Sequence, residues 1–211
     1  MASNIKVIYI GYGKIGKISE NLLNKHNLGE NLPIDIEYLL DNIFRINIIP
    51  FPNLLRDFNI NAFTSSDLKK IYIDEHLYLN LVHQYRFTLG HELGHIVLHK
   101  YFYKQFEIKD IGSYIDFLNS VDDTEYGYLE YQAHCFGGHF LVPSNHLEPQ
   151  FNKHSKNIID FVKKSFKGVE RKNYIELAVN IIAKKMSPAF NLHPRPIQIR
   201  IFKSGLARQI P

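Results

Sequence analysis

The chain has 211 residues, of which 45% are hydrophobic and 22% charged, with a formal net charge of +4. Such a chain can bury one good core and a small appendage, which excludes a disordered or fibrous protein. The N-terminal apolar run is about six residues long and lacks a cleavage pattern, so we expect no membrane span and no secretion. The single cysteine excludes an intrachain disulfide, and together these features predict a cytoplasmic protein.

The first recognisable pattern is a glycine-rich segment that follows this apolar run. Residues 5–10 and the segment from Gly11 to Gly16 match a strand and the Gly-x-Gly-x-x-Gly fingerprint of dinucleotide-binding proteins. That fingerprint also needs a βαβ unit of about 30 residues with an acidic residue closing a second parallel strand. Instead, residues 15–23 predict a short amphipathic helix, and residues 33–40 predict another with proline in its first turn. We interpret the glycines as a flexible lead-in to the first helix.

The sequence His-Glu-Leu-Gly-His at residues 91–95 predicts a metal site. On a helix, His91 and His95 lie about 40° apart in azimuth and one turn apart in height, so both rings can reach one ion. Glu92 points about 100° away from His91, which suits a general base that takes a proton from the attacking water. Apolar flanks predict a buried helix of about four turns over residues 85–98, and they disfavour the alternative of a surface helix with scattered histidines.

A catalytic zinc site usually takes three protein ligands, and a second helix at residues 130–143 can supply the third. Glu130 and His134 share one face of this helix. Gly137 and Gly138 follow on nearly the same face, although each costs about 1 kcal/mol in helix propensity. We interpret them as a patch without side chains that lets the two helices pack closely and brings Glu130 to the metal. A simple kink at the glycines is the alternative.

Two blocks of sequence together resemble the ImmA/IrrE metallopeptidases. The first is Arg-Phe-Thr-Leu-Gly-His-Glu-Leu-Gly-His-Ile-Val-Leu-His at residues 86–99, and the second is Glu-x-x-Ala-x-x-Phe-Gly-Gly-x-x-Leu-Val-Pro at residues 130–143. Segments at residues 46–50 and 70–74 look like the family's strands. The resemblance implies an α+β fold, in which a mostly helical zincin-like core contains a small β-sheet and precedes a short helical C-terminal region.

Carried over residue by residue, the resemblance implies His91, His95 and Glu130 as zinc ligands and Glu92 as the general base. Zinc suits two imidazoles and a carboxylate, but manganese or iron could occupy the same ligands. The clearest departure is His134, where the family usually has asparagine or aspartate. We interpret His134 as a hydrogen-bond partner of a ligand histidine or as an oxyanion stabiliser, and competition as a metal ligand stays open. The other oxyanion candidates are Tyr126, Tyr128 and Tyr131.

Two further side chains receive structural interpretations. His99 extends the motif helix by one turn and is predicted near its C-terminus, where a partial positive charge is favourable. Cys135 is predicted to be a small buried helix residue, because no metal-free arrangement with a histidine suggests a nucleophile.

Charge divides the chain near residue 150. Residues 1–150, the predicted metallopeptidase core, carry 12 basic and 18 acidic side chains, whereas residues 151–211 carry 13 basic and 3 acidic ones. Proline, asparagine and histidine cluster at residues 144–156, which predicts a boundary there. The basic part could hold DNA or an acidic partner, and a solvated basic face on helices that pack against the core is an interpretation of at least equal weight.

The C-terminal region is predicted to consist of short helices. One spans residues 172–185, a second starts at Ser187 and Pro188, and a last one spans residues 198–203 and is closed by Gly205, with two prolines interrupting before it. This arrangement resembles the helix-turn-helix-like segment that follows the peptidase core in some relatives.

The expected function is zinc-dependent hydrolysis of a peptide bond. By resemblance, the substrate is a helix-turn-helix repressor of the XRE or Cro/cI type, cut in an anti-repressor role to switch on genes of a mobile element or a stress response. Two other classes stay open: a non-catalytic module that binds a repressor or antitoxin, and a DNA-binding regulator that acts through residues 151–211. The intact set of His91, Glu92, His95 and Glu130 argues against a dead enzyme.

Overall fold

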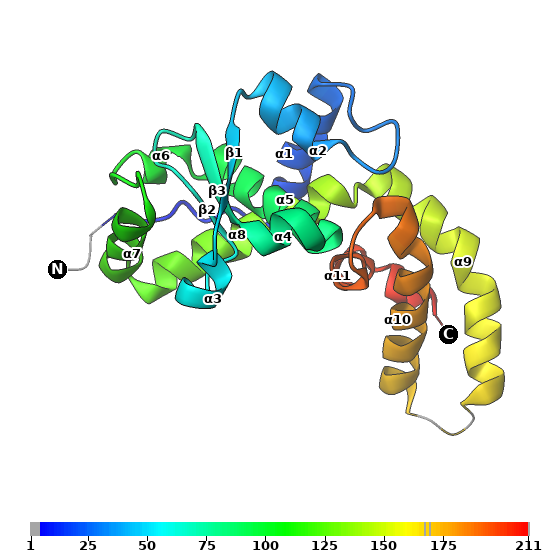
Figure 1. The fold of residues 1–211 in the computed structure, drawn as a ribbon. Helices are drawn as coiled ribbons and strands as arrows, with labels where there is room; N and C mark the ends of the chain where they lie inside the picture. Colours follow the sequence, from blue (N-terminus) through cyan, green and yellow to red (C-terminus); the bar gives the residue numbers. More distant parts are fainter. Residues whose placement is uncertain (1–4, 167, 169, 211) are drawn as a thin grey trace.

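The structure is a computed structural model that describes residues 5–166, 168 and 170–210. Helices dominate it, and a small three-stranded sheet lies at one end (Figure 1). The expected mostly helical α+β fold is therefore confirmed. Among the described residues, no helix combines the length and the apolar character needed to cross a membrane.

The elements follow one another in a simple order, with the sheet in the first half. They are α1 (Tyr12–Lys25), α2 (Ile36–Tyr38), a π-helical turn η1 (Leu39–Ile43), β1 (Asn47–Phe51), α3 (Leu54–Phe58), β2 (Ala62–Thr64), β3 (Lys70–Asp74), α4 (Glu75–Asn80), α5 (Val82–Leu98), α6 (Lys100–Tyr103), α7 (Ile111–Ser120), α8 (Asp123–Leu141), α9 (Ser144–Ser165), α10 (Arg171–Phe190), α11 (Pro194–Ser204) and a 3-10 turn η2 (Leu206–Gln209).

The sheet has the order β1-β3-β2, with β1 parallel and β2 antiparallel to β3. The strands expected at residues 46–50 and 70–74 correspond to β1 and β3. The three residues of β2 were not predicted, because so short a run cannot show alternation. Phe63 of β2 stacks between Tyr72 and Tyr114, with ring centroids 4.7 and 4.6 Å away. The stack packs β2, which is an edge strand of the sheet, against α7.

The N-terminal segment corrects two expectations. Residues 5–10 form no strand, and α1 begins at Tyr12, so Gly13 and Gly16 lie inside a helix and are not a flexible lead-in. A Cβ at Gly16 would lie 2.7 Å from Cε1 of His139, which explains that glycine by packing. In the next helix the N-cap is Asp35, whose carboxylate accepts from the Tyr38 amide. The proline at position 33 therefore precedes the first turn.

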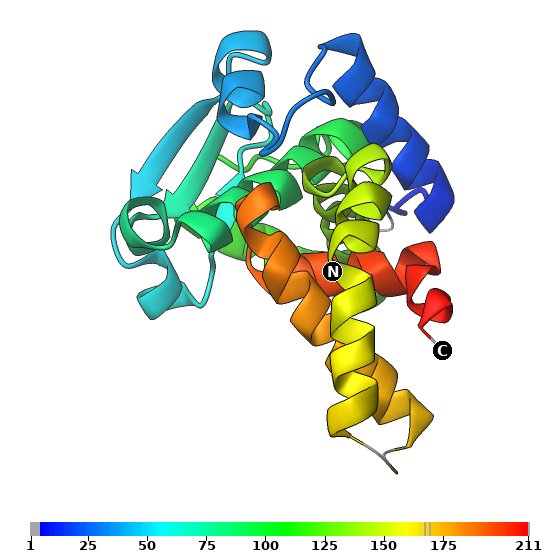
Figure 2. The same cartoon turned by 90° about the vertical axis from the view of Figure 1, so that its right-hand side faces the viewer.

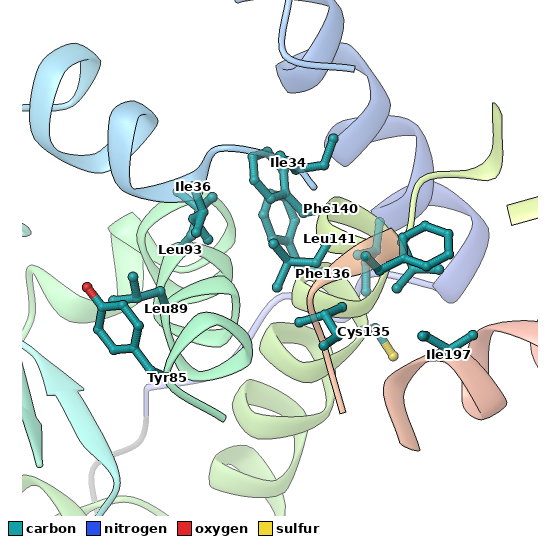
Figure 3. Close-up of a cluster of buried hydrophobic side chains, with 14 of the residues drawn as sticks. Ile34, Ile36, Tyr85, Leu89, Leu93, Cys135, Phe136, Phe140, Leu141 and Ile197 are labelled. Carbon is teal, nitrogen blue, oxygen red and sulfur yellow. The ribbon is translucent and has the colours of Figure 1, made fainter. Parts of the chain in front are cut away.

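The core lies mainly where α5 crosses α8. Leu89 and Leu93 of α5 and Phe136 and Phe140 of α8 are fully buried, and Figure 3 shows them in one buried cluster to which Ile34 and Ile36 also belong. Ile197 of α11 joins the same cluster from the C-terminal side. Burial of each such side chain contributes about 1.5–3 kcal/mol, so this crossing is a main source of stability.

Small residues set the distance between α5 and α8. A Cβ at Gly137 would lie 2.9 Å from the Gly90 carbonyl carbon and 3.0 Å from the His91 nitrogen. A Cβ at Gly94 would lie 2.8 Å from both Cα and the carbonyl oxygen of Ala133. The predicted close approach is thus confirmed for Gly137. Gly138 is different, because its nearest neighbour is an arginine side chain at an ordinary 3.7 Å.

In the C-terminal part, α9 and α10 form an antiparallel hairpin that extends away from the sheet (Figure 2). The boundary expected at residues 144–156 falls inside α9, where Pro149 lies within the helix. The division of the chain near residue 150 stays a prediction. Arg200 of α11 is buried and donates to the Val142 carbonyl at 3.1 Å, to the Tyr12 hydroxyl at 2.7 Å and to Ser144 Oγ at 3.1 Å.

Three helix boundaries in this part differ from the prediction. The helix expected at residues 172–185 is α10, but it continues through Ser187 and Pro188 to Phe190. Its buried face, which includes Met186 and Phe190, runs past the proline, so packing outweighs the proline's lost hydrogen bond. The later prolines do not interrupt: α11 begins at Pro194, as suits a residue without an amide proton, and ends at Gly205 with positive φ.

Candidate metal centre

The α5–α8 crossing brings three predicted ligands together. The Nε2 atoms of His91 and His95 lie 3.0 Å apart. One oxygen of Glu130 lies 3.2 Å from Nε2 of His91, and its other oxygen lies 3.3 Å from Nε2 of His95. The two rings and the carboxylate therefore converge on one point, although their role as ligands stays a prediction.

This donor set fits a divalent metal ion. Two imidazole nitrogens and a carboxylate are ligands that zinc accepts, and a catalytic site leaves a further position open. Ligand atoms of His91, Glu92 and His95 also lie within 4.8 Å of one another. The two Nε2 atoms lie at hydrogen-bond distance, 3.0 Å apart, so one ring can donate its N–H to the other, and an ion bound by both rings would replace that proton.

The electrostatics of the site keep the Glu130 carboxylate charged. Burial raises its pKa, but hydrogen bonds from His91 and His95 and the charge on those rings outweigh burial and leave the pKa well below its usual value. Burial lowers the pKa of His91, yet the hydrogen bond and charge of Glu130, with the charge of Glu92, raise it above its usual value. An anionic carboxylate thus faces two rings where a metal can replace protons.

Glu92 is buried and held by a residue that sequence reasoning missed. Thr64 Oγ1 donates a hydrogen bond of 2.7 Å to Oε2 of Glu92. Thr64 ends β2, the strand that the sequence did not reveal, and only the fold brings it to α5. The bond holds one carboxylate oxygen of Glu92 in place. Glu92 also lines the cleft, so its other oxygen is available to accept a proton there.

We predict that Thr64→Val lowers kcat by about tenfold to a hundredfold, because a buried hydrogen bond to a charged group contributes about 1.5–3 kcal/mol. Valine keeps the shape of threonine, and metal content should not change. Steady-state kinetics with a peptide substrate checks this, with Thr124→Val, on the exposed start of α8, as the control. Equal kcat in Thr64→Val and wild type would remove Thr64 from the site.

His99 was expected to carry partial positive charge near the end of α5. It does cap that end, but it is buried, and its Nδ1 lies 3.1 Å from Nδ1 of His95. Burial, with the neighbouring charge of His95, lowers the pKa of His99 to about 3, so the expected charge is wrong. A neutral His99 instead accepts or donates one hydrogen bond that orients the ring of His95.

His134 lies in the cleft beside the site. Its ring packs edge-on against Phe87, with centroids 4.9 Å apart, and burial lowers its pKa. Among the described residues, the structure contains no hydrogen bond between His134 and His91 or His95. Its possible roles as partner of a ligand, as ligand and as oxyanion stabiliser stay predictions.

The three candidate tyrosines separate clearly. Tyr126 lines the same cleft as Glu130. Tyr128 packs against Tyr9 with centroids 5.7 Å apart, and Tyr131 lies at a different cavity beside Cys135. Cys135 is a buried helix residue, as predicted. Of the three, Tyr126 is therefore the one placed to reach a substrate.

The cleft around these groups has the size of a typical ligand-binding cleft. It has a volume of about 610 Å³ and is bounded by α5 and α8, by residues 58–62 before and in β2, and by Tyr114 and Leu118 of α7. Tyr114 was not singled out in the sequence. β2 is an edge strand whose first residue, Ala62, lines the cleft, and edge strands are the places where extended peptides can pair with a sheet.

The fold and the converging histidines and glutamates define a metallopeptidase-like protein. Residues 43–168 match the model of the Peptidase M78 family, described as the IrrE N-terminal-like domain. This match covers more than half of the chain, so the protein belongs to that family, as the resemblance in its motifs indicated. A search of curated protein sequences gave no significant match.

Among solved structures, the chain is similar to a Mycobacterium tuberculosis transcriptional regulator. The TM-score is 0.50 and the sequence identity 14%, over 90% of this chain and 46% of the regulator. At this identity the likeness concerns the fold alone. The chain spans less than half the length of the regulator.

Proposed function

We propose that the protein is a zinc-dependent endopeptidase. The observation that supports this most is the convergence of His91, His95 and Glu130 beside a buried Glu92 in one open cleft. These three residues would hold the ion. The membership of a peptidase family supports the same reaction.

The reaction divides into steps that the protein's own residues perform. A bound metal ion supplies Lewis acidity, which lowers the pKa of water toward 7 and polarises the scissile carbonyl. Glu92, oriented by Thr64, accepts the proton of the attacking water and later delivers it to the leaving amine. The edge of β2 holds the peptide extended, and Tyr126 or His134 donates a hydrogen bond to the developing oxyanion.

We predict that Tyr126→Phe lowers kcat by about tenfold to a hundredfold and leaves KM and metal content close to those of the wild type. Burial, with the charge of Glu130, raises the pKa of Tyr126, so its hydroxyl keeps its proton and can donate. Tyr128→Phe is the control, because Tyr128 lies two residues further along α8, is 39% exposed and does not line the cleft. A larger loss in His134→Gln than in Tyr126→Phe would assign the role to His134.

The proposed substrate is a helix-turn-helix repressor of the XRE or Cro/cI type, cut in an anti-repressor role. The family resemblance supports this choice, and the solved structure with a similar fold is described as a transcriptional regulator. The test is to express the wild type and Glu92→Gln in the native host and to compare newly formed protein N-termini by mass spectrometry. A repressor cut only with the wild type supports the proposal, and identical N-termini in both strains contradict it.

A second candidate is DNA binding by the α9–α10 hairpin, which is favoured by its exposed basic side chains. They are Lys153, Lys156, Lys163, Lys164, Arg171, Lys172, Lys184 and Lys185. Duplex DNA affinity that falls steeply with salt, measured by fluorescence anisotropy, would support this function. A non-catalytic module would instead bind a repressor tightly and leave it uncut.

A further inference from the structure

A second cavity lies beside the catalytic cleft, between the N-terminal end of α5 and the start of α11. Its volume is about 580 Å³, which is ample for one or two amino-acid side chains. Its apolar lining comes from both helices and the turn before α5: Leu81, Val82, Phe87, Pro196 and Ile199.

The cavity lies next to the cleft and shares part of its lining. Gln84, Phe87 and His134 line both spaces, so these three side chains form the shared wall. Gln84 also donates to Oδ1 of Asn61 at 3.4 Å, on the approach to β2. A peptide that lies along β2 and past the metal ligands would therefore place a neighbouring side chain over this second cavity.

Apolar side chains remain exposed at this place. Val82 is 53% exposed and Leu81 38% exposed, at the junction of α4 and α5. Covering such surface with an apolar group gains about 25 cal/mol for each Å² removed from water. Since the site is concave and both residues face it, an apolar side chain of the substrate is the occupant that fits.

One permanently charged side chain, that of Arg195, lines the cavity. Arg195, His193 and His83 line it, and no acidic residue does so in the part of the chain that the structure describes. Arg195 is exposed and makes no salt bridge with any described residue. A carboxylate beside the bound apolar side chain would give Arg195 its partner.

We infer that this cavity is a specificity subsite, which selects a polypeptide with an apolar side chain next to an acidic residue near the scissile bond. The inference rests on the proposed peptidase function and adds the sequence preference to it. The bound side chain would lie next to the scissile bond, on the side of the cleft nearest the N-terminal end of α5.

The test uses a library of short random peptides in two ways. Metal-loaded wild-type protein cleaves the mixture, and the sequences around each cut are read by mass spectrometry. Immobilised metal-loaded Glu92→Gln protein selects binders from the same mixture. Both experiments are repeated with Val82→Glu and Arg195→Glu added. The matched controls are Leu79→Glu, an exposed apolar residue outside the cavity, and Lys184→Glu, an exposed basic residue of α10.

We expect apolar residues to be enriched at one fixed position in bound and cut peptides, with acidic residues beside it. Val82→Glu should remove the apolar preference and Arg195→Glu the acidic one, each by at least tenfold, whereas the controls keep both. Cutting with preferences that neither variant changes would overturn the subsite alone. If nothing is cut, the peptidase proposal fails, and the binding selection still decides on the cavity: selected sequences unaffected by either variant would overturn it.

Discussion

Replacing Glu130 by alanine is expected to empty the site of metal. Wild-type protein should carry about one zinc ion per chain, and both Glu130→Ala and His95→Ala should lose it, because each removes one of three converging ligands. Removing only a hydrogen-bond partner of a ligand already weakens binding by about tenfold to a hundredfold, so loss of a ligand should exceed that. Plasma mass spectrometry of protein repleted with zinc measures the content directly.

Two further variants make this result specific. Glu107→Ala, with a side chain that is 84% exposed, should keep its metal and controls for loss of negative charge. Glu92→Gln should also keep its metal while losing peptidase activity, because the proposed role of Glu92 is proton transfer. Full metal content in Glu130→Ala would mean that His134 or another group is the third ligand. No zinc in repleted wild type would instead favour a non-catalytic binding module.

Gly94→Ala is expected to cost about 1–3 kcal/mol of the free energy of unfolding. The added methyl group would lie 2.8 Å from the Ala133 backbone, which cannot move aside as a side chain can. The midpoint of thermal unfolding should fall by about 2–4 °C for each kcal/mol lost. Activity should fall more steeply, since pushing α8 outward moves Glu130 away from His91, and a misplacement of about 1 Å can cost about a hundredfold in rate.

Replacing a glycine that has open space beside it by alanine should instead raise the free energy of unfolding. Gly127 lies in α8 with no atom within 4 Å of an added Cβ, so Gly127→Ala should stabilise the protein by up to about 1 kcal/mol. Gly138→Ala meets only an arginine side chain at 3.7 Å and should be tolerated. Differential scanning calorimetry measures the thermal stability of the three variants. Equal stability of Gly94→Ala and Gly127→Ala would show that the helices do not need their close contact.

The parts of the site that follow local rules could be predicted from the sequence. His91 and His95 share a helix, so their spacing alone determines that they meet. Glu130 lies on another helix, and its approach could be inferred from the two glycines that suggested a close neighbour and from the family resemblance. Gly90 and Gly94, four residues apart on α5, are a second signal of the same kind in the sequence.

What depends on three-dimensional context could not be predicted. Thr64 reaches Glu92 through a three-residue strand that has no sequence signature. The charge of His99 depends on its burial, which the helix end alone does not reveal. A proline usually begins a helix, which is why the sequence predicts a helix start at Pro188, but the buried face of α10 continues past it.

The placement of His91 and Glu130 on different helices has a consequence for stability as well as for chemistry. A cation bound by both would cross-link α5 to α8 in the native state only, because unfolding separates two residues that are distant in sequence. Each tenfold rise in free metal above its dissociation constant would then add about 1.4 kcal/mol to the free energy of unfolding. Metal supply would thus govern how long the folded chain survives heat or proteolysis, apart from any effect on turnover.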